Sequence, residues 1–253
     1  MHNEIATYLS PYRDRLDELY GWRFDEDIPH KAFGFTFSGK TPFQKDTELK
    51  RQMSEAAKRA SEAAKEQLAN YFIKDWGGIV SFSNAKAIIE RVNSVSFSAV
   101  PARADFSFKG ISSWSKWLSI VCPEWACIYD ARVAYSLNAI NYISGAKQRI
   151  FPMPEGRNTK LNILDITTLL LRKRLSAADS SNPKTIKTSH FVPEAAAYEK
   201  YTELIHTVHS LLWGSSAPLY YSEMLLFSLA DTYIYRDVFA ACISCGPVDS
   251  PKI

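Results

Sequence analysis

The chain has 253 residues and a formal net charge of +3, and 46% of its residues are hydrophobic and 13% aromatic. This composition excludes a disordered chain, a collagen-like repeat and a small disulfide-stapled protein. The length is enough to bury a sizeable core, so we expect a single unit over 1–253 with approximate lobes at 1–80, 81–175 and 193–253.

The N-terminal part predicts short segments followed by one long helix. Charged side chains interrupt Met1–Tyr20, which therefore lacks the apolar run of a secretory signal. Prolines and a Phe/Gly-rich run in 1–48 favour loops and short helices. From Thr47, as the capping residue, to about Phe72, an Ala-, Glu-, Lys- and Arg-rich run predicts an exposed helix that packs through a narrow alanine stripe.

Apolar periodicity predicts further helices along the rest of the chain, at 84–92, 111–121, 131–143, 161–174, 193–212 and 220–241. Asn84 and Asp130 are the expected caps of two of them, and Gly145 the expected end of the helix at 131. The polar segment 176–192, which contains Pro183, predicts a linker. Because neither an alternating strand array nor a repeat stands out, the predicted fold class is mainly α.

Cysteine content and hydropathy favour a cytoplasmic monomer with no membrane partner. The four cysteines form two distant pairs, Cys122 with Cys127 and Cys242 with Cys245, which suits a reducing compartment. Apolar neighbours favour buried free thiols over a metal site for the second pair. No window approaches the roughly 18 consecutive apolar residues of a membrane span.

Charge is distributed unevenly along the chain. Residues 1–100 hold 14 basic and 14 acidic side chains, residues 101–190 hold 13 and 6, and residues 191–253 hold 3 and 7. The middle segment therefore carries a charge of +7, and the last one −4. An excess of this kind is typical of an ordinary solvated surface or of a surface that faces phosphates.

The segment 112–133 carries the pattern that points to chemistry. Lys116 lies near the start of a predicted hydrophobic helix, Pro123 stops that helix, and an apolar run then ends in Asp130, at the start of the next one. Lys116 and Asp130 are 14 residues apart. This order resembles that of the helix-hairpin-helix DNA glycosylases, especially divergent bacterial proteins described as like 8-oxoguanine DNA glycosylase.

The resemblance implies a helix-hairpin-helix glycosylase-like fold and hydrolysis of the N-glycosidic bond of a flipped base, which leaves an abasic site. Lys116 corresponds to the family's nucleophile and Asp130 to its acidic residue. Proteins of this divergent type include anti-phage enzymes that remove modified cytosines, so antiviral defence is one implied role. The base stays open among 8-oxoguanine, another damaged base and glucosylated hydroxymethylcytosine. No cofactor is expected.

Chemical reasoning supports the two positions. Positive charge develops on the sugar as the base departs, and a fixed carboxylate such as Asp130 stabilises it. Lys116 can attack the anomeric carbon only as a free amine, which burial and a cationic neighbour favour. Whether Lys116 forms a Schiff base, with strand cleavage to follow, or water attacks directly stays open. The enzyme must also extrude the nucleotide and stack its base in a pocket.

Further residues are assigned by their position around this motif. The expected partner is double-stranded DNA with one modified or damaged base. Residues expected to contact its backbone are Ser112, Ser113, Ser115, Arg132, Lys109, Lys147 and Arg149. Aromatic candidates for the base pocket are Trp114, Trp117, Trp125 and Tyr129.

Two other functions fit parts of the sequence. In a non-catalytic helical module that binds nucleic acid, Lys116 would contact phosphate and Asp130 would only cap a helix. In a metal-dependent hydrolase, His206 and His209 would bind the metal, although no H-E-x-x-H pattern accompanies them and helix-surface histidines are the simpler interpretation. The non-catalytic module differs from the enzyme in where the Lys116 and Asp130 side chains point, and the metal hydrolase needs an acidic or His ligand that converges on the two histidines.

Overall fold

The computed structural model describes residues 1–79, 85–94, 106–155, 158–175 and 185–244. Helices predominate among these residues, and extended pairing within them is limited to one isolated bridge between Ile150 and Phe191. The predicted mainly α class is therefore confirmed. The expected cap Asn84, the thiol of Cys245 and most of the expected linker 176–192 lie outside the described residues. No helix in the described part of the chain has the length and hydropathy needed to cross a bilayer.

The helices follow one another along the chain in a fixed order. They are α1 (His2–Leu9), α2 (Leu16–Leu19), α3 (Asp27–Phe33), α4 (Pro42–Arg59), α5 (Glu62–Asn70), α6 (Ala85–Asn93), α7 (Ile111–Val121), α8 (Ala131–Ser144), α9 (Thr159–Ile163), α10 (Ile166–Arg174), α12 (Glu194–Trp213), α13 (Tyr220–Leu229) and α14 (Tyr235–Ser244). A 3₁₀ turn at Ser10–Arg15 and two π-helical turns, at Tyr71–Trp76 and Ala230–Ile234, connect neighbouring helices.

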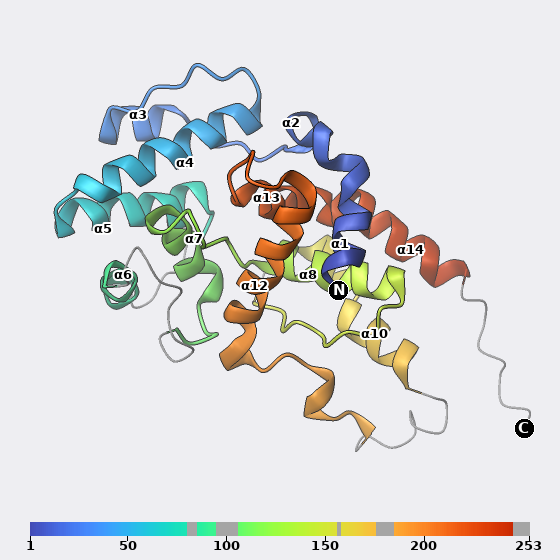
Figure 1. Cartoon of the computed structure of the whole chain (residues 1–253). Coiled ribbons are helices and arrows are strands. Elements are labelled where there is room, and N and C mark those ends of the chain that lie inside the picture. Colours follow the sequence, from blue (N-terminus) through green and yellow to red (C-terminus); the bar gives the residue numbers. More distant parts are fainter. Residues whose placement is uncertain (80–84, 95–105, 156–157, 176–184, 245–253) are drawn as a thin grey trace, which may run out of the picture.

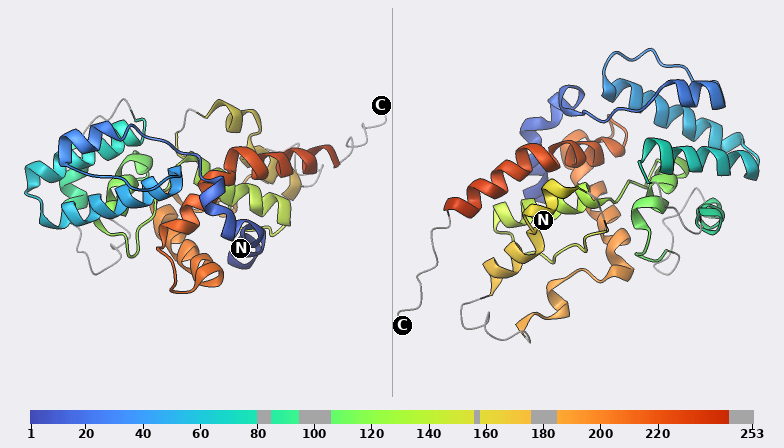
Figure 2. Two further views of the ribbon diagram at one scale, coloured as in Figure 1. Left: turned by 90° about the horizontal axis from the view of Figure 1, so that it is seen from above. Right: turned by 180° about the vertical axis from the view of Figure 1, so that it is seen from behind.

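The helices gather into two groups that meet at α7 and α13. At one end lie α3, α4, α5 and α6, and at the other lie α1, α8, α10, α12 and α14 (Figures 1 and 2). The N-terminal helix α1 packs against α8 and α12, whereas α4 and α6 pack against α7. Because α1 belongs with the C-terminal helices in space, the chain returns to its starting point and brings distant segments together.

The long helix predicted from Thr47 to Phe72 is wrong in its bounds and in its burial. Thr41 caps α4 by accepting a hydrogen bond from Gln44 N, and Pro42 fits the first helical position because its missing N–H is not needed there. The backbone is extended at Ala60, and Ser61 caps a second helix, α5. The buried face of α4 is not an alanine stripe, because it also contains Asp46, Leu49, Lys50 and Met53.

Other predicted helices are confirmed, or are broken where a local signal was overlooked. Helices α7 and α8 match the prediction closely, with Asp130 as the cap of α8 and Gly145 in the left-handed conformation at its end. The helix predicted at 161–174 is two helices, because Asn158 caps α9 and Asp165 caps α10. The helix predicted at 220–241 is interrupted by the π-helical turn at Ala230–Ile234.

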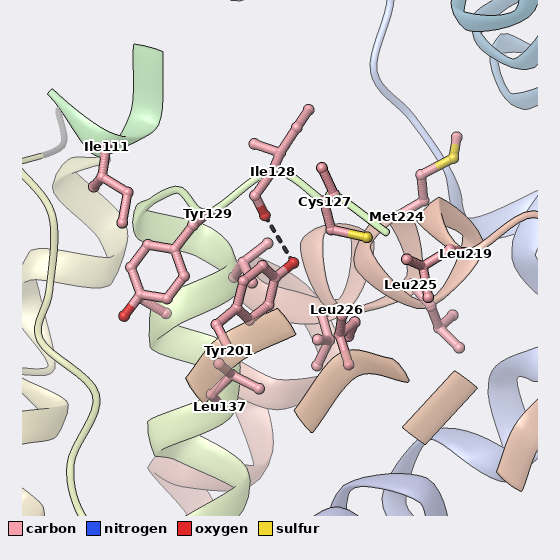
Figure 3. Packing of buried hydrophobic residues seen from close by; sticks show 14 of the residues in the cluster. Ile111, Cys127, Ile128, Tyr129, Leu137, Tyr201, Leu219, Met224, Leu225 and Leu226 are labelled. Carbon is pink, nitrogen blue, oxygen red and sulfur yellow. Dashed lines mark hydrogen bonds between the residues drawn. The ribbon is translucent and has the colours of Figure 1, made fainter. Parts of the chain in front are cut away.

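A continuous apolar core joins the two groups of helices. The loop between α7 and α8 passes through it, so that Cys127, Ile128 and Tyr129 are fully buried against α12 and α13 (Figure 3). Tyr201 of α12 fixes this loop by donating its hydroxyl hydrogen to Ile128 O at 2.8 Å. Cys122 and Cys127 are buried free thiols, and Cys242 is half-buried. The same loop ends at Asp130, so the core determines where that carboxylate lies.

Candidate active site

Lys116 and Asp130 line one cavity, between the two groups of helices. The cavity contains about 340 Å³ of empty space, counted out to its open mouth. Its walls come from five separate parts of the chain: the segment after α2, the end of the π-helical turn before α6, helix α7, the loop before α8, and helix α13. The lining residues are Tyr20, Trp22, Trp76, Gly77, Lys116, Ile128, Asp130, Glu223 and Phe227.

The amine of Lys116 is held inside the protein. The residue is 6% exposed, and its Nζ donates a hydrogen bond to the carbonyl of Ser112, one turn earlier in α7, at 3.1 Å. Burial lowers the pKa of Lys116 below its ordinary value, although the carboxyls of Asp130 and Glu223 act in the opposite direction. A lowered pKa increases the fraction of neutral amine, which is the nucleophilic form.

Gly77 makes room for the Lys116 side chain. A Cβ atom at Gly77 would lie 2.8 Å from both Cδ and Cε of Lys116 and 2.6 Å from the carbonyl oxygen of Ile73. These distances are too short for non-bonded atoms, so only glycine allows the lysine to pass here. Gly77 directly follows the π-helical turn Tyr71–Trp76, an irregularity often found at functional sites.

Asp130 is positioned by its role as a helix cap. Its Oδ1 accepts the Val133 N–H at 2.9 Å, and the positive end of the α8 dipole favours a negative charge at this place. Arg132, two residues later, pairs with Asp231 at 2.9 Å and lies over the ring of Phe227, with 4.6 Å from its guanidinium carbon to the ring centroid. Asp130 therefore caps α8 through Oδ1 and also lines the cavity.

The aromatic walls come from residues that the sequence did not single out. Trp22 lies edge-on to Trp76 and to Phe227, with centroid distances of 6.0 and 5.6 Å, and Trp76 stacks on Phe72 at 4.1 Å. Trp22 Nε1 is buried, and within the described residues nothing accepts its hydrogen. Flat aromatic faces and a free donor are features that suit the binding of a planar, polar ring.

A buried charged cluster lies next to the cavity. Asp46 and Lys50, one turn apart on α4, and Glu223 on α13 are each at most 5% exposed. Lys50 Nζ is 3.5 Å from Asp46 Oδ2 and 4.0 Å from Glu223 Oε1. Asp46 also accepts hydrogen bonds from the Tyr20 hydroxyl at 2.8 Å and from Trp76 Nε1 at 2.7 Å. The cluster therefore anchors two of the cavity's aromatic walls.

The aromatic residues predicted for the base pocket, Trp114, Trp117, Trp125 and Tyr129, do not line this cavity and are buried in the core. Trp114 Nε1 donates to Ser107 O and Trp117 Nε1 to Asn93 Oδ1. Tyr129 donates to Pro152 O and packs edge-on against Tyr201 (Figure 3). These side chains therefore contribute to the packing of the core.

The predicted DNA contacts divide into buried and exposed residues. Ser113 is 7% exposed and Ser115 is fully buried, with its hydroxyl accepting the Tyr129 N–H, so neither reaches a phosphate and both predictions are wrong. Ser112 is half-buried and uses its carbonyl for Lys116. Lys109, Lys147 and Arg149 are exposed, as a phosphate contact requires, whereas Arg132 is half-buried in its pair with Asp231.

Part of the positive charge of the middle segment serves the fold. Lys173 donates to Tyr142 O at 2.7 Å, and Arg174 and Lys160 donate to the carbonyls of Gln148 and Asp231. These three cations are thus engaged in connecting α8, α9 and α10 to their surroundings. Because these carbonyls are neutral, the hydrogen bonds fix the positions of three of the cations without reducing the +7 of residues 101–190.

The two histidines of α12 do not form a metal site. Nε2 of His209 donates to Ala217 O at 3.0 Å and its Nδ1 accepts from the Ser222 hydroxyl at 3.1 Å, so both ring nitrogens are occupied. Nε2 of His206 donates to Trp125 O at 3.2 Å. Across the described parts of the chain, no three His, Cys, Asp or Glu side chains converge as metal ligands. The metal-hydrolase alternative therefore lacks its site.

Sequence reasoning missed Glu223, Lys50 and the aromatic walls. Charged residues in an apolar pattern are the signal that was available for two of them: Glu223 interrupts the apolar run of α13, and Lys50 lies among residues of α4 that face the core. Nothing local marks Tyr20, Trp22 or Phe227, which reach the cavity only through the fold.

Comparison with known proteins gives no match: no protein-family model, no curated protein and no solved structure is similar enough to this chain to be matched to it.

Proposed function

We propose that the protein is a DNA glycosylase, which hydrolyses the N-glycosidic bond of a flipped, modified or damaged base. The observation that supports this most is that a buried lysine amine and a helix-capping carboxylate, 14 residues apart in the sequence, line one aromatic-walled cavity. A glycosylase needs these groups together: flat rings to hold a base, and a carboxylate and a nucleophile close to the sugar.

In the proposed reaction, Asp130 acts through its charge. The carboxylate stabilises the positive charge that grows at the sugar's anomeric carbon as the C–N bond stretches. The hydrogen bond from Val133 N to Oδ1 fixes the direction of the Asp130 carboxylate before the substrate binds, so the site needs little reorganisation. Lys116 attacks the same carbon as a neutral amine, or positions a water that does so; the amine route gives a Schiff base.

The candidate bases are those that the sequence resemblance includes. They are 8-oxoguanine, another damaged base and glucosylated hydroxymethylcytosine, whose attached sugar needs the most room. Release of glucosylated hydroxymethylcytosine would support a role in antiviral defence.

The test is base release from a panel of duplexes that each carry one candidate base, measured in single turnovers with wild-type protein and with Asp130→Asn. Asparagine keeps the helix cap but not the charge. We expect Asp130→Asn to lower the rate by at least about 10²-fold, the usual cost of losing an electrostatic stabiliser. Equal rates for the two proteins would contradict the mechanism, and duplex binding without any release would favour the non-catalytic module.

Borohydride trapping decides the role of Lys116. A covalent protein–DNA adduct with the wild type, absent in Lys116→Gln, supports the amine as nucleophile. Active base release without an adduct assigns the attack to water.

A further inference from the structure

A second carboxyl group, outside the Lys116/Asp130 motif, lines the candidate site. Glu223 is on α13, is 3% exposed and borders the same cavity as Lys116 and Asp130. Its Oε2 accepts the Ile128 N–H at 3.1 Å, and its Oε1 is 4.0 Å from Lys50 Nζ. The loop that carries Asp130 therefore also holds Glu223 in place.

The two carboxyls of the cavity have different surroundings. Asp130 is half-buried, and it sits at the N-terminus of α8, where a negative charge is favoured. Glu223 is buried, and burial raises its pKa to about 7, even though Lys50 and the Ile128 N–H favour its charged form. When one carboxyl of a pair is kept charged and the other is kept protonated, the pair can divide the roles of stabiliser and acid.

A protonated Glu223 is compatible with the rest of the buried cluster. Lys50 keeps Asp46 as an anionic neighbour at 3.5 Å and lies over the rings of Trp76 and Tyr220, at 5.5 and 5.1 Å. Protonation of Glu223 therefore leaves no isolated buried cation. Burial favours the neutral form of Lys50, and the charged carboxyls of Glu223 and Asp46 raise its pKa; when Glu223 is protonated, the contribution of Asp46 is the one that remains.

Resting on the glycosylase function proposed above, we propose that Glu223 is the general acid of this site, and donates its proton to the departing base. As the C–N bond breaks, its electron pair stays with the base, which takes the proton from Glu223 and leaves as a neutral molecule. Water or the Lys116 amine then bonds to the anomeric carbon, and the proton that it loses restores the Glu223 carboxyl. Asp130 takes no part in this proton transfer.

Several titratable and charged groups surround Glu223 and contribute to its pH behaviour. They come from the segment after α2, from α4, α7, α12 and α13, and from the loop before α8: Tyr20, Asp46, Lys50, Lys116, Cys127, Asp130, Tyr198, Tyr201 and Tyr220. Burial raises the pKa of the Cys127 thiol and of the four tyrosines, so these five groups stay neutral near pH 7.

The experiment compares the pH dependence of single-turnover base release in wild type and Glu223→Gln. Since the acid must be protonated, we expect the wild-type rate to fall by about tenfold per pH unit above about pH 7. We expect Glu223→Gln to be slower by about 10²–10⁴-fold at pH 6 and to lose this alkaline decline. The Glu223→Gln substitution should slow release less for those bases that leave more readily as anions.

Two further variants distinguish a Glu223 that acts as general acid from a Glu223 that only stabilises the fold. Lys50→Met removes the cation that lowers the pKa of Glu223, so the alkaline decline should move to higher pH. Glu194→Gln, an exposed glutamate at the start of α12, is the matched control and should keep the wild-type profile.

Stability gives a readout that does not require activity. In the folded protein the pKa of Glu223 exceeds its ordinary value of 4.5, so ionisation between about pH 4.5 and 7 destabilises the fold, and Glu223→Gln escapes this loss. The denaturation midpoint of Glu223→Gln should therefore rise relative to wild type between pH 4 and pH 8. If the wild-type protein releases base and Glu223→Gln does so with the same rate and pH profile, the role of Glu223 as general acid is overturned and the proposed function stands. If the wild-type protein releases no base, both proposals are overturned.

Discussion

At the scale of single residues, the candidate site depends on the close approach of Gly77 to the Lys116 side chain as much as on its charged groups. Lys116 reaches the cavity by passing over Gly77, where any side chain would overlap its methylenes. The π-helical turn Tyr71–Trp76 brings the backbone to this point, and Trp76, its last residue, forms a wall of the same cavity. One short segment therefore sets both the path of the amine and part of the surface that would hold a base.

We predict that Gly77→Ala lowers base release by about 10²-fold, because small displacements of a reacting group cost about this much. Overpacking against Ile73 O and Lys116 should also lower the free energy of unfolding by about 1–3 kcal/mol. Gly21→Ala is the control for stability, since a Cβ there meets nothing within 4 Å and the change should be within about 0.5 kcal/mol. Denaturant unfolding and single-turnover rates measure the two effects. A fully active Gly77→Ala would show that Lys116 can take another path.

At the scale of elements, helix caps explain both the successes and the errors of the sequence prediction. Asp130 was expected to cap the helix at 131 and does so, through Val133 N. Asp165 was overlooked as a cap, and it divides the helix predicted at 161–174 by accepting hydrogen bonds from Thr167 N and Thr168 N. Capping is a local effect of one side chain on the next turn, so it can be predicted wherever the pattern is noticed.

The two caps provide a matched comparison for the role of Asp130. We predict that Asp130→Ala and Asp165→Ala each lower the free energy of unfolding by about 1 kcal/mol, because both lose a capping carboxylate. Only Asp130→Ala should also lose base release. Thermal unfolding and activity assays on the same preparations give both values. Equal activity in the two variants would reduce Asp130 to a structural residue.

At the scale of the whole molecule, the charge available to a partner differs from the charge counted along the sequence. Lys116 is buried, and the charge of Arg132 is paired with that of Asp231. Lys109, Lys147 and Arg149 remain exposed candidates for contact with the DNA backbone. Salt dependence measures such contacts, since each neutralised phosphate releases counterions.

We predict that Lys109→Ala and Arg149→Ala each reduce the slope of log affinity against log salt concentration by about 0.9, the value for one phosphate contact on duplex DNA. Lys31→Ala serves as the control: this exposed lysine of α3 pairs with Asp27 in the neutral N-terminal part, and its loss should leave the slope unchanged. Fluorescence anisotropy over a range of salt concentrations gives the slopes. Unchanged slopes in both test variants would place the DNA elsewhere.

The sequence by itself determined the mainly α class and helices α7 and α8, with Lys116 on the first and Asp130 as the cap of the second, because propensity, apolar periodicity and capping act within a few residues. Only the tertiary structure decided what surrounds that pair. Tyr20, Trp22, Trp76 and Glu223 come from segments far apart in the sequence, and they meet because α2 packs on α13 while the π-helical turn Tyr71–Trp76 packs on α7. Burial then changes the chemistry of Lys116 and Glu223, since the cost of holding a charge depends on the surrounding medium, which no local pattern specifies.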